Sequence, residues 1–137
     1  MLDDMTRAAG TIGVLVVDDE PRHRALCRLA LESFDGIDVI GEAHNGRRGI
    51  ELAAELQPDL VVLDLRMPIM DGLSALPEIL RAAPFARVVV WSATGDSPIH
   101  RVEAREAGAV ACIRKDASLD QLVAVLLEQG AGELTVA

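Results

Sequence analysis

Aromatic residues are scarce in this sequence. Among 137 residues there are two phenylalanines, one tryptophan and no tyrosine: Phe34, Phe85 and Trp91. A hydrophobic core must therefore be built from aliphatic side chains, chiefly those of valine, leucine, isoleucine and alanine. Half of the residues are hydrophobic and 26% are charged, which is typical of a globular chain and excludes a disordered one. The length suits a single domain with a substantial core.

Basic residues are also few. The sequence has 13 basic and 22 acidic residues, which gives a net charge of −9. A chain without a basic face is poorly suited to grip nucleic acid by itself, although it is compatible with cation binding. The two cysteines, Cys27 and Cys112, lie far apart in apolar segments, which predicts two buried thiols in a reducing cytosol and no disulfide. Three scattered histidines form no metal-binding motif.

Long apolar runs are missing as well, since no stretch approaches the roughly 18 residues of a membrane span. The segment Met1–Gly10 is polar and acidic, and lacks the basic flank and apolar core of a signal peptide. We therefore expect a cytoplasmic protein with no membrane contact. The expected organisation is a flexible tail over residues 1–10, one domain over 11–129 and a C-terminal tail over 130–137.

Five short apolar segments alternate with helical patterns along the chain. The predicted strands are Ile12–Val17, Ile37–Ala43, Leu60–Asp64, Arg87–Ser92 and Val110–Arg114. Short apolar strands joined by helical crossovers indicate a parallel sheet that is covered on both faces. With right-handed crossovers, the α/β fold expected is a flavodoxin-like (βα)5 three-layer sandwich with strand order 2-1-3-4-5.

Capping signals mark the starts of the intervening helices, which we expect at about 21–33, 47–56, 71–82, 98–108 and 119–128. The signals are Pro21 in a first turn, Asn45-Gly46, Ser97-Pro98, and a capping box at Ser118–Gln121. Pro77 is unusual within the third helix. Either that helix starts as late as Ser74, so that Pro77 falls in its first turn, or it bends there.

The stretch Leu60–Gly72 carries the first functional signal. Its apolar run ends on Asp64, and a turn containing Pro68 and the pair Asp71-Gly72 follow. A buried strand of this kind delivers its terminal acid to the carboxyl edge of the sheet, where open α/β proteins bind ligands. Two more acids, Asp18 and Asp19, end the first strand, which borders the expected switch point between strands 1 and 3.

A hydroxyl and an ammonium reach the same edge, because Ser92 ends the fourth strand and Lys115 follows the fifth. Crowded carboxylates repel one another unless a cation is present, and Mg²⁺ combines carboxylate with phosphate oxygens. A carboxylate can also attack phosphorus and give an aspartyl phosphate. Each feature alone is common as a cap or a solvated charge. Together they favour Asp64 as nucleophile, with Mg²⁺ and Lys115 neutralising charge and Ser92 donating a hydrogen bond.

Four segments make the chain resemble a receiver domain of two-component response regulators over about residues 11–129. They are VVDDE (16–20), LDLRMPIMDG (63–72), VVVWSA (88–93) and GAVACIRKDAS (108–118). The resemblance implies that Asp64 takes a phosphoryl group from a histidine kinase and that the chain catalyses only its own phosphorylation and dephosphorylation. It also implies a set of site residues: Asp18, Asp19, Asp64 and the backbone carbonyl of Arg66 for Mg²⁺, and Ser92 and Lys115 for the phosphoryl group.

The Lys-Asp-Ala-Ser ending at 115–118 resembles a subfamily whose receivers often precede a helix-turn-helix DNA-binding domain. This implies a role in transcriptional control through an effector domain that is separate or missing, with no nucleic-acid contact by this chain. Besides the kinase, the expected partners are a downstream effector and a second copy of the chain. A homodimer would use either the 98–128 face or the first and last helices.

The sequence departs from the family pattern at two places. Cys112 stands in the fifth strand where the family commonly has tyrosine or phenylalanine. The family resemblance implies that this position and Ser92 form the switch. Asp116 stands where many relatives have proline. The variable positions are Arg66 and Thr94, which the family suggests tune the lifetime of the phosphoryl group.

Two other classes of function remain as alternatives. Cys112 motivates the first, a receiver-fold interaction module that works without phosphorylation. The second is a hydrolytic phosphatase with an aspartyl nucleophile. Such enzymes carry another acid two residues after the nucleophile, and Arg66 occupies that place here.

Overall fold

The fold is described from a computed structural model, which covers residues 10–93 and 98–131. Most of both predicted tails, the predicted cap Ser97 and the variable position Thr94 lie outside these residues. In the described part of the chain, no helix is long and apolar enough to cross a membrane.

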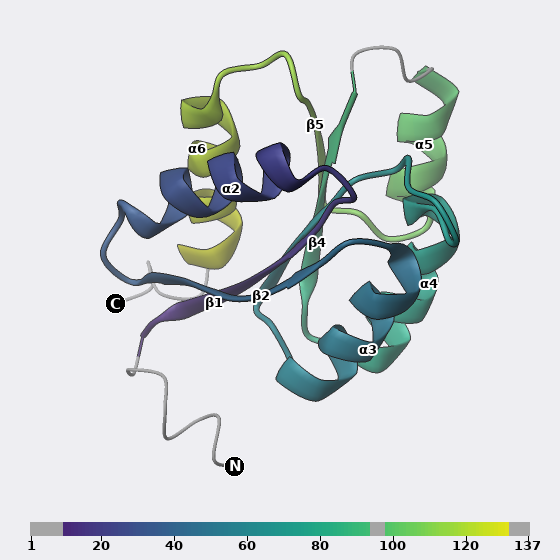
Figure 1. Ribbon diagram of the computed structural model, residues 1–137, viewed down its shortest axis with the longest axis horizontal. Coiled ribbons are helices and arrows are strands. Elements are labelled where there is room, and N and C mark those ends of the chain that lie inside the picture. Colours follow the sequence, from purple (N-terminus) through teal and green to yellow (C-terminus); the bar gives the residue numbers. More distant parts are fainter. Residues whose placement is uncertain (1–9, 94–97, 132–137) are drawn as a thin grey trace.

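Five parallel strands form a single sheet, and their order is β2-β1-β3-β4-β5 (Figure 1). The strands are β1 (Ile12–Val17), β2 (Ile37–Ala43), β3 (Leu60–Leu63), β4 (Arg87–Ser92) and β5 (Ala111–Arg114). The predicted strand order is confirmed. Because β1 pairs with both β2 and β3, the chain changes winding direction at the β1/β3 pair, where an open α/β sheet has its crevice.

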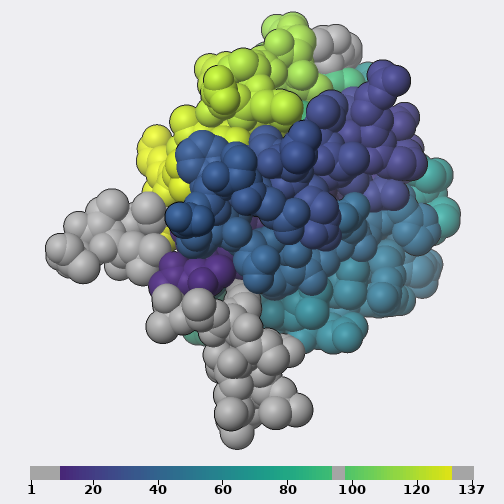
Figure 2. Space-filling view, turned by 60° about the vertical axis from the view of Figure 1, so that its left-hand side comes forward, coloured from purple at the N-terminus to yellow at the C-terminus, as the bar shows by residue number. Residues whose placement is uncertain are grey.

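Helices cover both faces of this sheet and complete the predicted three layers. They are α2 (Pro21–Glu32), α3 (Gly46–Leu56), α4 (Gly72–Ala82), α5 (Pro98–Glu106) and α6 (Leu119–Ala131). Figure 1 shows α2 and α6 on one face and α3, α4 and α5 on the other. In the space-filling view of Figure 2, α6 in yellow-green lies against α2 in dark blue.

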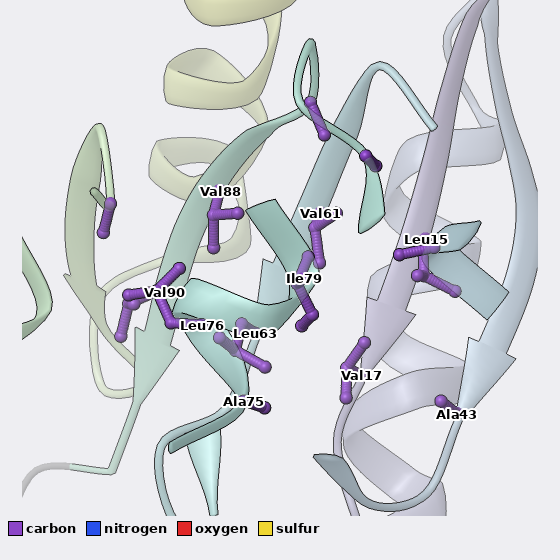
Figure 3. Close-up of a cluster of buried hydrophobic side chains, with 14 of the residues drawn as sticks. Leu15, Val17, Ala43, Val61, Leu63, Ala75, Leu76, Ile79, Val88 and Val90 are labelled. Atoms are coloured by element: carbon purple, nitrogen blue, oxygen red, sulfur yellow. The ribbon is translucent and has the colours of Figure 1, made fainter. Parts of the chain in front are cut away.

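The core is aliphatic, as the lack of aromatics predicts. On the α3/α4/α5 face, side chains such as Leu15, Leu63 and Ile79 interlock between the sheet and α4 (Figure 3). On the α2/α6 face, Trp91 is the one aromatic member of the core and is only 3% exposed. Phe34 and Phe85 contribute little, because they are 42% and 93% exposed.

Most of the predicted caps form the expected hydrogen bonds. The side-chain oxygen of Asn45 accepts from the Arg48 N–H at 2.8 Å, and Ser118 Oγ accepts from the Gln121 N–H at 3.2 Å. Pro21 is the first residue of α2, where its missing N–H leaves no helix bond unmade. These caps set where the chain leaves the sheet edge and enters each helix.

Some predicted boundaries are wrong by a few residues. Strand β3 ends at Leu63, one residue before Asp64, and β5 begins at Ala111 instead of Val110. Helix α6 continues to Ala131, beyond the expected end near Glu128. Helix ends fray and depend on tertiary contacts, which periodicity does not report.

The late start considered for the α4 helix is also wrong. Asp71 caps α4 by accepting the Ser74 N–H at 2.8 Å, so Pro77 lies inside the helix and not in its first turn. The cost of the missing N–H is offset by packing, because the neighbouring side chains Leu76 and Ile79 are fully buried.

The loop from Asp64 to Asp71 is packed closely against the backbone around it. A Cβ atom on Gly72 would overlap the carbonyl oxygen of Asp64, and one on Gly46 would lie 2.5 Å from the Met70 oxygen. Glycine at these two places lets the loop lie directly beside the end of β3. The same loop holds Ile69 at φ 70°, a left-handed conformation that is strained for a β-branched residue.

We expect Ile69→Gly to raise the free energy of unfolding by about 1 kcal/mol, because glycine relieves the left-handed strain and only part of the gain is lost to chain entropy. Little packing is sacrificed, since Ile69 is 75% exposed. Urea unfolding at equilibrium measures the change. Ile69→Val keeps the β-branch and should give no gain, and destabilisation by Ile69→Gly would contradict the strain.

Candidate functional site

Three carboxylates meet at the carboxyl edge of the sheet. Asp18, Asp19 and Asp64 each offer an oxygen, and these oxygens all lie within 4.8 Å of one another. Asp18 and Asp64 are buried, at 1% and 4% exposure, whereas Asp19 is exposed. The structure therefore brings together the three acids that the sequence places at the ends of strands 1 and 3.

The register of β1 and β3 explains why the two buried acids meet. Val17 pairs with Leu63, so the residues that follow them, Asp18 and Asp64, leave the sheet side by side. The pairing continues one step further, because the Asp64 N–H donates to the Val17 oxygen at 2.9 Å. Two apolar strands that both end in an aspartate thus place two carboxylates against each other.

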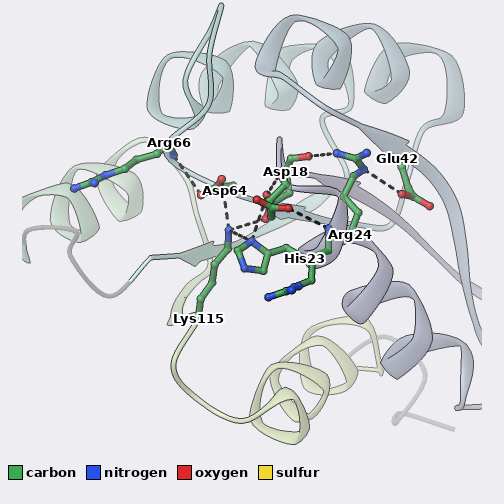
Figure 4. A network of polar contacts seen from close by, with 9 residues as sticks. Asp18, His23, Arg24, Glu42, Asp64, Arg66 and Lys115 are labelled. Carbon is green, nitrogen blue, oxygen red and sulfur yellow. Dashed lines mark hydrogen bonds and ion pairs between the residues drawn. The ribbon is translucent and has the colours of Figure 1, made fainter.

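The ammonium of Lys115 lies between these carboxylates (Figure 4). Its Nζ is 2.7 Å from Asp18 Oδ2 and 3.5 Å from Asp64 Oδ2. The Lys115 side chain is only 10% exposed. Its backbone N–H donates to the Ser92 carbonyl oxygen at 2.7 Å, so the end of β4 holds the Lys115 backbone in place.

Ser92 is buried at 1% exposure, and its Oγ has no hydrogen-bond partner among the residues that the structure describes. A buried hydroxyl without a partner is costly and uncommon. It is the state expected of a donor whose acceptor arrives with a ligand. Ser92 ends β4 at the carboxyl edge of the sheet, as the sequence predicts, and its binding of a phosphoryl group stays a prediction.

Crowding changes the protonation of Asp64. Its pKa rises to about 7, first because burial removes the carboxylate from water and second because the Asp18 charge repels it. The Lys115 ammonium and the Arg66 N–H, which donates to Asp64 Oδ1 at 3.3 Å, lower the pKa and so limit the rise. Asp19 adds a smaller repulsion.

This donor set fits a hard divalent cation. Mg²⁺ takes carboxylate and carbonyl oxygens together with water, and three converging carboxylates compensated by one ammonium leave negative charge for it to neutralise. The Arg66 backbone lies beside Asp64, while its guanidinium points away from the acids in Figure 4. The acidic cluster is therefore a candidate magnesium site.

Sequence reasoning missed several residues that brace the site. Arg24 Nη1 donates to the backbone oxygen of Asp18 at 2.7 Å, and its Nε donates to Glu42 Oε1 at 3.2 Å (Figure 4). Arg28 Nε holds the other Glu42 oxygen at 2.7 Å. The spacing of Arg24 and Arg28, one helical turn apart on α2, is the only signal that could have suggested this contact.

The prediction of two buried thiols needs correction. Cys27 is fully buried, and burial raises its pKa to about 12. Cys112 is only half-buried, with Sγ 3.9 Å from the Arg101 carbonyl oxygen, and burial also raises the pKa of its thiol. Both cysteines are free thiols, as predicted. Neither has the lowered pKa of a reactive cysteine.

Fold and site together define a class of protein: a flavodoxin-like domain with an acidic cluster and one lysine at the switch point of its sheet. Residues 14–127 match the family model described as the response regulator receiver domain. The chain belongs to this family, and the resemblance drawn from its motifs is confirmed.

Named relatives agree with this assignment. The nitrate/nitrite response regulator protein NarL of Escherichia coli K12 is 37% identical over 90% of this chain and 56% of its own length. A protein-glutamate methylesterase/protein-glutamine glutaminase of Methanococcoides burtonii is 40% identical over 81% of this chain and 32% of its own. The response regulator domain of Thermotoga maritima CheB superposes with a TM-score of 0.78 at 34% identity, covering 93% of this chain and 98% of that one.

This chain therefore spans from about a third to just over half of the length of those two curated relatives. Their likeness supports the receiver domain, and the Lys-Asp-Ala-Ser ending stays a prediction as a mark of subfamily.

We expect Asp64→Asn to stabilise the metal-free protein at neutral pH, on the order of 2 kcal/mol, because it removes a buried and repelled charge. The folded pKa lies above the unfolded one, so the native state binds more protons between about pH 4 and pH 7, and wild-type stability falls as pH rises through that window. The gain should thus be absent below about pH 4 and complete above about pH 7. Urea unfolding in EDTA across this range measures it.

Asp38→Asn is the matched control, because Asp38 is exposed on β2 and distant in sequence from the cluster. It should leave stability unchanged. Mg²⁺ should raise the melting temperature of the wild type more than that of Asp64→Asn. If the free energy of unfolding depends on pH in the same way for the wild type and Asp64→Asn, burial and repulsion of the Asp64 charge do not affect stability.

Proposed function

We propose that this receiver domain accepts a phosphoryl group on Asp64 from a histidine kinase, with Mg²⁺ at Asp18, Asp19, Asp64 and the Arg66 carbonyl. The observation that carries the proposal is the contact of the single Lys115 ammonium with both buried carboxylates, Asp18 and Asp64. Such a cluster is costly to fold, and it is explained if the site is built to receive a charged group.

The chemistry is an in-line displacement at phosphorus. An oxygen of Asp64 forms the new O–P bond, and the P–N bond of the donor phosphohistidine breaks with its electron pair left on the imidazole nitrogen. Bound Mg²⁺ supplies charge neutralisation for the transferred group. Lys115 offers N–H donors to the same group, and the buried Ser92 hydroxyl, which has no partner among the described residues, donates to a phosphoryl oxygen.

Phosphorylation would then alter a surface. The phosphoryl group adds about −1.5 to −2 charges, which draw the Lys115 ammonium and the Ser92 hydroxyl toward it. Ser92 ends β4 and Lys115 follows β5, the two strands that flank α5 in the chain, so we propose that the β4–α5–β5 surface shifts and changes partner affinity. Because Cys112, on β5, is too small to move as an aromatic switch would, we propose that the main movement is at Ser92.

The partners proposed are the histidine kinase, a downstream effector and a second copy of the chain, with no direct contact to nucleic acid. Residues 11–129 would form the receiver, with tails at 1–10 and 130–137. Transcriptional control is the proposed output, as the Lys-Asp-Ala-Ser ending at 115–118 suggests. We propose no activity beyond the chain's own phosphorylation and dephosphorylation. A cytoplasmic location stays a prediction from the sequence.

Incubation with Mg²⁺ and acetyl phosphate should add one phosphoryl group to the wild type, because this donor supplies the same phosphorus centre with acetate as leaving group. Intact-mass spectrometry detects the gain, and borohydride reduction marks the acyl phosphate as homoserine at position 64. The gain should be lost in EDTA and in Asp64→Asn.

Asp38→Asn should be phosphorylated like the wild type and so controls for removal of one acid. A stable gain in Asp64→Asn would show that another residue is the acceptor. Continuous release of phosphate from a small ester would instead favour the hydrolase.

The alternative, an interaction module independent of phosphorylation, predicts a different binding pattern. Under our proposal, self-association measured by sedimentation velocity should increase at least several-fold when Mg²⁺ and acetyl phosphate are added to the wild type. Asp64→Asn should show no such increase, because no phosphoryl group forms. Equal association of both proteins with and without donor would favour the alternative.

A further inference from the structure

Lys115 is the only lysine in the sequence, since the other basic residues are all arginine. Its ammonium has three N–H donors and no acceptor capacity. Three acceptor atoms surround it: Asp18 Oδ2 at 2.7 Å and Asp64 Oδ2 at 3.5 Å, which form ion pairs with it, and His23 Nδ1 at 3.1 Å, which forms a hydrogen bond. Two of these acceptors belong to the acid cluster, and the third, His23, comes from the first turn of α2.

The geometry defines what His23 does in this contact. An ammonium can only donate, so in the 3.1 Å hydrogen bond between Lys115 Nζ and His23 Nδ1 the ring nitrogen is the acceptor. The same Nδ1 is 3.8 Å from Asp18 Oδ1, which is too long for a hydrogen bond. His23 therefore contacts the acid cluster chiefly through the lysine.

The Trp91 ring contacts both Lys115 and His23. Its ring centroid is 5.3 Å from Lys115 Nζ, which is cation–π distance, and 5.6 Å from the His23 ring, which it meets edge to face at 68°. Trp91 is 3% exposed and directly precedes Ser92 in β4, so it is held rigidly by the sheet. The ammonium thus has an aromatic wall and an imidazole nitrogen as acceptor besides its two carboxylates.

We propose that His23 and Trp91 are positioning residues that hold Lys115 for phosphoryl transfer. The inference rests on the proposed function, in which Asp64 is the acceptor. When Asp64 becomes an acyl phosphate, the ammonium must turn from the carboxylates toward the phosphoryl oxygens. The His23 acceptor is unchanged by that reaction, so it keeps one N–H while the other two become available to the phosphoryl group.

The test compares His23→Leu with His23→Asn. Leucine removes the acceptor, whereas the asparagine Oδ1 takes the place of the imidazole Nδ1. With saturating Mg²⁺ and acetyl phosphate, His23→Leu should slow phosphorylation about tenfold, the effect of one lost hydrogen bond to a charged group. His23→Asn should stay within about twofold of the wild type, because an acceptor is retained.

A double-mutant cycle shows whether the effect passes through the lysine. In a Lys115→Met background, His23→Leu should cause no further loss of rate. A merely structural role would slow both backgrounds by the same factor, and that result would overturn the proposal.

A second readout needs no phosphorylation. Because there is one lysine, ¹⁵N-lysine labelling gives a single Nζ resonance in the side-chain region. His23→Leu should shift this resonance and speed exchange of its hydrogens, and His23→Asn should restore both. If the wild type is phosphorylated but His23→Leu matches it in rate and in the Nζ signal, the proposal fails while the proposed function stands. If the wild type is never phosphorylated, the proposed function fails, and the Nζ comparison alone decides whether His23 holds the ammonium.

Discussion

The contact of the Lys115 ammonium with Asp18 and Asp64 is the interaction on which the site depends. Two carboxylates that are almost without solvent exposure cannot both stay charged at low cost, and one cation between them offsets only part of the repulsion. The pKa of Asp64 is raised, first because burial disfavours its charged form and second because the charge of Asp18 repels it. That residual imbalance is what a divalent ion and a phosphoryl group would relieve.

The rest of the fold holds these groups in place. Paired ends of β1 and β3 deliver the acids, and the adjacent ends of β4 and β5 deliver Ser92 and Lys115. The loop after Asp64 is packed so closely that glycine is required at Gly72, and it carries a strained Ile69. Backbone strain and crowded charge thus occur in the same few residues. The aliphatic core on both faces of the sheet supplies the stabilisation that offsets both.

Much of this could be predicted from the sequence. Apolar runs that end in a polar residue mark both strands and a site, so the positions of Asp18, Asp64, Ser92 and Lys115 at the sheet edge followed from one pattern. The sheet order followed from the alternation of these strands with helices. His23, Trp91 and the Arg24–Glu42 brace could not be found this way. Their contacts depend on how α2 docks on the sheet and turns its first turn toward β4, and no local pattern encodes that orientation. The conformation of Ile69 and the extent of α6 likewise depend on tertiary packing.

Lys115 holds its ammonium between the two acids, from where we propose that it moves to the phosphoryl group. A crystal structure with Mg²⁺ and fluoroberyllate, a stable mimic of the acyl phosphate, tests it most directly. We expect fluoroberyllate on Asp64, with Lys115 Nζ turned from Asp18 to a fluorine atom while its contact with His23 Nδ1 is kept. Lys115 still paired with Asp18, or fluoroberyllate bound elsewhere than on Asp64, would contradict it.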